Sequence, residues 1–89
     1  MKKLVFIENQ SGDFEAEFEV TGDFNLHLER DNKGTVTILQ KTYIDGEYAL
    51  SNEFPYYYNN FDYDFTGLIY PKMIKVISNN EVRLGVVTP

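Results

Sequence analysis

The segment Phe14-Glu-Ala-Glu-Phe-Glu-Val20 alternates apolar and acidic residues without a break. In an extended strand successive side chains point to opposite faces of a sheet. This alternation would therefore place the apolar residues on one face and the glutamates on the other. A helix would bring Phe14 and Phe18 together, but it would scatter the three glutamates around its surface. The segment therefore predicts a β-strand with one buried face and one solvent-facing side.

The same two-residue period continues on both sides of this segment. Residues 24–28 alternate again after a turn at Gly22, and residues 35–42 are rich in β-branched side chains, which favour strands. Asp31–Gly34 and Asn79–Asn80 carry turn residues, so each predicts a hairpin. Residues 51–60 contain Pro55 and paired asparagines and are predicted to form a loop. Strands are expected over 3–8, 14–20, 24–28, 35–42, 47–50, 61–65, 73–78 and 81–87.

The pattern predicts an all-β fold in one domain, residues 1–89. Short strands separated by regular turn signals are typical of a sandwich or a small barrel. We expect a small antiparallel β-sandwich, jelly-roll-like or immunoglobulin-like, with about seven or eight short strands. The inward-facing residues are expected to be Phe14, Ala16, Phe18, Val20, Phe24, Leu26, Leu28, Val36, Ile38, Ile74, Val76, Val82, Leu84 and Val86.

Composition narrows the possible classes of function. The 89 residues carry a formal net charge of −6, which argues against binding to nucleic acid or to an anionic membrane surface. The chain has no cysteine, so disulfides and thiolate zinc sites are excluded. Its first apolar stretch is too short for a signal peptide or a membrane span. We therefore expect a soluble protein made in the cytoplasm.

The segment around three consecutive tyrosines is the strongest candidate for a contact surface. Neighbouring side chains of an extended chain alternate in direction, so Tyr56, Tyr57 and Tyr58 cannot all enter one core. At least one of them is expected to be exposed, and tyrosine is enriched in protein interfaces. Packing on the core and stacking on a sugar are the alternatives. The candidate interface is Phe54, Tyr56, Tyr57, Tyr58, Asn59, Asn60 and Phe61.

Residues that could carry chemistry are few. His27 is the only histidine and is expected to face solvent with its strand neighbours Asn25 and Glu29. Asp62 and Asp64 should share one face of a strand and, with Glu53 near them in sequence, could offer oxygen ligands to calcium or an acid–base pair. A solvated strand face explains the same pattern. No nucleophile–base pair or metal set is recognisable, so we expect no enzyme, no metal and no cofactor.

The glutamates of the opening segment form an acidic stripe. Glu15, Glu17 and Glu19 would lie on one face of the strand, where charge also discourages edge-to-edge aggregation. The stripe is either a water-facing side of the sheet or a surface that steers a basic partner.

The segment from Gly34 to Tyr48 resembles part of a known group of proteins. It reads Gly34-Thr-Val-Thr-Ile-Leu-Gln-Lys-Thr-Tyr-Ile-Asp-Gly-Glu-Tyr48 and is similar to a strand and "D-G" turn of small β-sandwich virion proteins of tailed bacteriophages. Tyr48 stands where that group commonly has tryptophan, and Lys41 stands where it has arginine. The order of strands over residues 12–88 is similar as well.

The resemblance implies a structural, non-catalytic role in a phage particle. Proteins of that group serve as capsid decorations, head-fibre bases and head–tail or tail adaptors. The expected protein is thus a multi-copy virion component that contacts other virion proteins and forms a homo-oligomer. The alternative is a carbohydrate-binding module that uses the tyrosine-rich segment.

Overall fold

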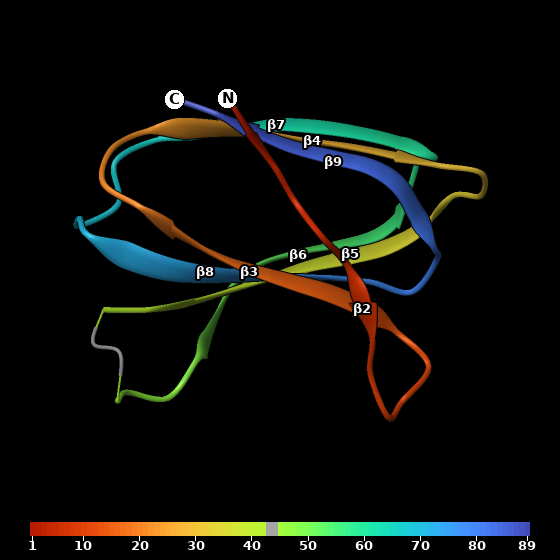
Figure 1. The fold of residues 1–89 in the computed structure, drawn as a ribbon, viewed down its shortest axis with the longest axis horizontal. Helices are drawn as coiled ribbons and strands as arrows, with labels where there is room; N and C mark the ends of the chain where they lie inside the picture. The colour runs from red at the N-terminus through yellow and green to blue at the C-terminus, as the bar shows by residue number, and fades with distance from the viewer. Residues whose placement is uncertain (43–44) are drawn as a thin grey trace.

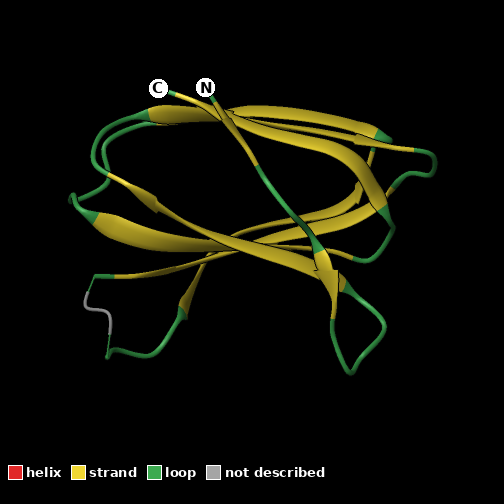
Figure 2. Cartoon of the chain, viewed as in Figure 1, coloured by secondary structure: helices red, strands yellow, loops and turns green. Residues whose placement is uncertain are grey.

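Two antiparallel sheets face each other in the computed structural model, which describes residues 1–42 and 45–89 (Figure 1). The described residues form strands and loops without a helix, which confirms the predicted all-β sandwich (Figure 2). Sheet A has the order β1 (Lys2–Lys3), β9 (Val82–Thr88), β4 (Phe24–Arg30) and β7 (Asn60–Phe65). Sheet B has the order β2 (Ile7–Glu8), β3 (Phe14–Val20), β8 (Lys72–Ser78), β5 (Gly34–Lys41) and β6 (Ala49–Tyr57).

The core lies between the sheets and follows the two-residue period of the strands. In β3 the residues Ala16, Phe18 and Val20 are buried, whereas Glu17 and Glu19 are exposed. Phe14, at the start of this strand, is only half-buried. The buried apolar set is Leu4, Ala16, Phe18, Val20, Phe24, Leu26, Leu28, Val36, Ile38, Phe61, Phe65, Ile74, Val76 and Val87.

The two hairpins expected at Asp31–Gly34 and Asn79–Asn80 are wrong. β4 and β5 belong to different sheets, and so do β8 and β9, so each connection crosses from one sheet to the other. Turn residues indicate that the chain reverses, but they do not determine which sheet the next strand joins. Burial of the next strand's apolar face decides that choice.

The expected loop at residues 51–60 is also wrong, because β6 runs through most of it. β6 is the last strand of sheet B, and its pairing with β5 shifts register between Gly34 and Val36 and between Ile38 and Leu39. An edge strand with bulges can accept Pro55, since proline lacks only the hydrogen-bond donor that an interior strand would need. The strand expected at 47–50 is therefore the beginning of this longer one.

The N-terminal segment is not the single strand expected over 3–8. β1 pairs with β9 in sheet A, and β2 pairs with β3 in sheet B, so the segment crosses one side of the sandwich (Figure 1). The Leu4 amide donates to the Gly85 carbonyl at 2.8 Å. Gly85 allows this close passage, because a Cβ at that position would lie 2.7 Å from Cε1 of Phe6.

The inward-facing side of β9 changes part of the way along the strand. Val82 packs against the core as expected, but Leu84 and Val86 pair with Glu29 and His27 on the outer face of sheet A. A register shift at Glu29 and Arg30 produces the change. Because a bulge inserts one residue, every later side chain moves to the opposite face. Gly85 and Val87 are buried there instead.

Candidate functional site

The turn between β6 and β7 divides the tyrosine-rich segment into exposed and buried members. Tyr56 is 84 % exposed and Tyr58 is 76 % exposed. Tyr57 points inward, where its ring lies 4.8 Å from the ring of Phe61 and 5.8 Å from that of Phe54. The prediction that at least one tyrosine is exposed is therefore confirmed.

Two phenylalanines of the expected interface belong to the core side of this segment. Phe61 is 0 % exposed, so its assignment to a contact surface is wrong. It is an inward-facing residue of β7, and its ring packs against Phe54 at 5.1 Å. Phe54 is partly buried, whereas Asn59 and Asn60 are exposed. The accessible part of the candidate interface is thus Tyr56 and Tyr58 with the two asparagines.

Tyr56 has a backbone conformation that side chains other than glycine rarely adopt. Its φ angle is 58°, in the left-handed region. The residue lies at the bulge where Phe54 and Tyr57 oppose Val36 and Gly34 of β5. A left-handed conformation costs a residue with a Cβ roughly 1–2 kcal/mol, so neighbouring contacts must hold the turn in place.

Arg30 supplies many of those contacts from inside the sandwich. Its side chain is 0 % exposed at the end of β4. One guanidinium nitrogen, Nη2, donates to the Tyr58 carbonyl at 2.8 Å, and Nη1 donates to Ser78 Oγ at 3.1 Å. Longer hydrogen bonds reach the carbonyls of Gly34, Thr35, Tyr57 and Asn59. The guanidinium thus joins the β6–β7 turn to the β4–β5 connection and to β8.

The charge of this buried arginine is balanced by oxygen dipoles. Burial lowers the pKa of the Arg30 guanidinium. Because the ordinary pKa of arginine is very high, the group keeps its proton at neutral pH. Arg30 was not among the residues expected from the sequence to form a site. The available signal was its position, because Phe24, Leu26, Leu28 and Arg30 occupy alternate, inward-facing sites of one strand.

His27 belongs to a polar cluster on the outer face of sheet A, which we call the β4–β7 cluster: Asn25, His27, Glu29, Asp62 and Asp64. Nδ1 of His27 lies 2.9 Å from Asp62 Oδ2, and Nε2 lies 3.0 Å from Glu29 Oε2. Asn25 Nδ2 donates to Asp62 at 2.6 Å and to Asp64 at 2.9 Å. The expected solvent-facing position of His27 is confirmed.

The geometry of the β4–β7 cluster fits a protonated imidazole. Carboxylates only accept hydrogen bonds, so both ring nitrogens of His27 must donate. The hydrogen bonds to Glu29 and then to Asp62 raise the pKa of His27. The hydrogen bonds from Asn25 and then from His27 lower the pKa of Asp62. The cluster is a network of charge-assisted hydrogen bonds on an exposed sheet face.

For the calcium and acid–base interpretations of Asp62 and Asp64, the fold brings no third carboxylate from Glu53, and hydrogen bonds within the β4–β7 cluster already engage both side chains. Both carboxylates already accept from the amide of Asn25. Glu53, the third residue considered, lies on β6 of the other sheet. Within residues 1–42 and 45–89 there is no group of three or more histidine, aspartate or glutamate side chains that could hold a metal ion.

The acidic stripe of β3 has partners across sheet B. Glu17 pairs in register with Lys75 of β8 and accepts a hydrogen bond from the Tyr48 hydroxyl at 2.6 Å. The ammonium groups of Lys41 and Lys75 each lie 4.6 Å from the centre of the Tyr48 ring. Burial, and then the hydrogen bond to Glu17, raises the pKa of Tyr48. At the centre of the stripe, Glu17 therefore bonds to Tyr48, whose ring contacts two lysines.

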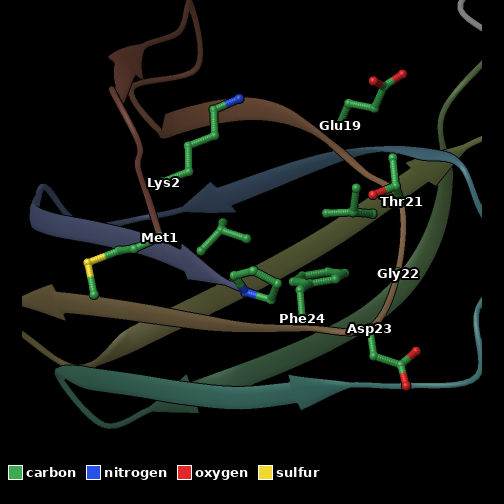
Figure 3. A pocket seen from close by; sticks show the side chains of 10 residues that line it. Met1, Lys2, Glu19, Thr21, Gly22, Asp23 and Phe24 are labelled. Carbon is green, nitrogen blue, oxygen red and sulfur yellow. The ribbon is translucent and has the colours of Figure 1, made fainter.

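A shallow cavity of about 280 Å³ opens at one end of the sandwich. Figure 3 shows Phe24 in the middle of its lining, with Met1 and Lys2 on one side and Thr21 and Asp23 on the other. The side chains of Glu19 and Asp23 point away from each other (Figure 3). This lining combines an aromatic ring with charged side chains that lie apart, and its residues are not arranged for catalysis.

Comparison of the chain with profiles of known protein families, with curated proteins and with solved structures found no match. In the part of the chain that the structure describes, there is also no helix long and apolar enough to cross a membrane.

Proposed function

We propose that this chain is a structural component of a tailed-phage virion, present in many copies and acting through protein–protein contacts. The observation that supports the proposal is the pair of exposed tyrosines, Tyr56 near the end of β6 and Tyr58 on the turn that follows, whose backbone Arg30 holds from inside. A large aromatic side chain on a backbone that is already held in place loses less freedom when a partner covers it than one on a mobile loop. The resemblance of residues 34–48 to phage sandwich proteins supports a place in the virion.

Self-association is part of this proposal. Copies of the chain are expected to meet through Tyr56 and Tyr58, with Asn59 and Asn60 as polar neighbours at the rim. The protein would be made in the host cytoplasm and then incorporated into the particle.

Quantitative mass spectrometry of purified virions tests the assignment to the particle. The proposal predicts a fixed ratio of this chain to the major capsid protein, with several copies in each particle. If washed particles lack the chain while it stays abundant in the lysate, the virion role is refuted.

The second candidate is a carbohydrate-binding module, and the same two exposed rings favour it. Tyrosine faces stack on sugar rings, and the amides of Asn59 and Asn60 can hydrogen-bond sugar hydroxyls. A glycan array with the wild type and a Tyr56→Ser/Tyr58→Ser variant separates the two functions. Saturable binding that disappears in the variant would support a carbohydrate-binding module, whereas no binding to any glycan on the array would refute it.

A further inference from the structure

The free edge of β7 differs from the other edges of the sandwich. On the opposite side, the N-terminal segment adds β1 to β9 and β2 to β3. On this side, β6 ends sheet B and β7 ends sheet A, with no further described strand beside either one. Over residues 1–42 and 45–89, the chain therefore covers parts of two edges with its own strands and leaves two others open.

β6 has backbone irregularities that protect an edge from another strand, whereas β7 has charged side chains but a regular backbone. β6 has two register shifts, a proline at position 55 and the left-handed Tyr56. These features disturb the row of backbone groups that a new strand would need. β7 pairs with β4 along all six of its residues without a register shift. Its outer row of backbone groups is therefore regular.

The two faces of β7 offer different chemistry to a strand placed beside it. On the outer face Asp62 and Asp64 are exposed and are aligned by Asn25. On the inner face Tyr63 is 39 % exposed, and its ring lies 4.9 Å from that of Phe54 on β6. An added strand would thus meet carboxylates on one face and aromatic rings on the other.

We propose that β7 binds an extended segment of a partner protein by strand addition, with lysine or arginine opposite Asp62 and Asp64 and apolar residues toward Tyr63 and Phe54. Backbone hydrogen bonds to the edge would supply affinity, and the alternating side chains would supply specificity. A second copy of β7 does not fit, because it would place aspartates beside aspartates, and like charges on neighbouring strands are destabilising. This surface is separate from Tyr56 and Tyr58, so it goes beyond the function proposed above.

A synthetic peptide of eight alternating lysine and valine residues is the probe. Methyl groups on the amide nitrogens of one edge prevent the peptide from stacking on itself. A second peptide with glutamate in place of lysine is the matched probe. Amide hydrogen exchange, followed by nuclear magnetic resonance, locates the bound strand, and titration gives its affinity.

The lysine peptide is expected to protect amides of β7 and to bind more tightly than the glutamate peptide. The Asp62→Asn/Asp64→Asn variant should weaken its binding roughly tenfold, since two cross-strand charge pairs are lost. Glu53→Gln, an exposed acid on β6, should leave the affinity unchanged, and Tyr56→Ser/Tyr58→Ser should do the same.

Three results would overturn the proposal. The first is equal affinity for the two peptides, or no binding at millimolar concentration. The second is protection of β3 or β6 in place of β7. The third is protection of β7 that grows with protein concentration alone in the Tyr56→Ser/Tyr58→Ser variant, which would identify a second copy as the occupant. None of these results depends on whether the exposed tyrosines form an interface.

Discussion

Replacement of Arg30 by methionine tests how the turn that carries the exposed tyrosines is held. Methionine keeps much of the length of the side chain but removes every donor. The two shortest hydrogen bonds, to Tyr58 and Ser78, are each worth about 1.5–3 kcal/mol because the donor is charged. Part of this gain is offset by the cost of burying the guanidinium. We expect the free energy of unfolding to fall by about 3 kcal/mol.

Unfolding in guanidinium chloride, followed by circular dichroism, measures this fall in the free energy of unfolding. A domain of this length would lose roughly 15 °C in Tm and would remain folded at room temperature. Arg83→Met is the matched control, because Arg83 is 53 % exposed and bonds to an exposed aspartate, Asp31. That surface pair should contribute less than about 1 kcal/mol. If Arg30→Met and Arg83→Met cost the same, Arg30 does not hold the turn.

Three further substitutions test separate parts of the structure. Tyr56→Gly should raise the free energy of unfolding by about 0.5–1 kcal/mol, because relief of the left-handed conformation exceeds the entropy cost of glycine; denaturant titration measures it. His27→Gln should lower Tm more at pH 5.5 than at pH 9. The folded-state pKa of His27 is raised, so its stabilisation is complete below the unfolded value of about 6.5 and is lost as pH rises through the folded value. Gly85→Ala should destabilise the protein by about 1–3 kcal/mol, because the new methyl group would meet the Phe6 ring; thermal unfolding measures it.

Each of these predictions has a result that contradicts it. A less stable Tyr56→Gly protein would mean that the tyrosine side chain itself holds the bulge. A Tm difference for His27→Gln that grows toward alkaline pH would show that the neutral imidazole is the form that stabilises the fold. An unchanged Gly85→Ala protein would mean that the N-terminal crossing has room to move.

Local alternation predicts the strands of this protein well, because burial of one face acts on each strand separately. It identified β3 and β4 and their core residues from the period alone. It failed where a strand's face depends on a bulge, as at Leu84 and Val86. It also failed at the connections between sheets, since a turn has the same residues whether the chain stays in one sheet or crosses to the other.

The candidate site was predicted only in part. Alternation required at least one of the three tyrosines to be exposed, but it could not decide which, because the bulge at Tyr56 is a property of the pairing with β5. The role of Arg30 depends on carbonyls that are distant in sequence, such as that of Tyr58. The contact between His27 and Asp62 likewise arises from the register of β4 and β7.

The proposed virion role requires copies of this chain to associate through Tyr56 and Tyr58. Sedimentation equilibrium over a range of concentrations, with the wild type and with Tyr56→Ser/Tyr58→Ser, tests it most directly. We expect a defined oligomer for the wild type at micromolar concentration and a folded monomer for the variant. A wild type that stays monomeric at every concentration, or a variant that assembles as the wild type does, would contradict it.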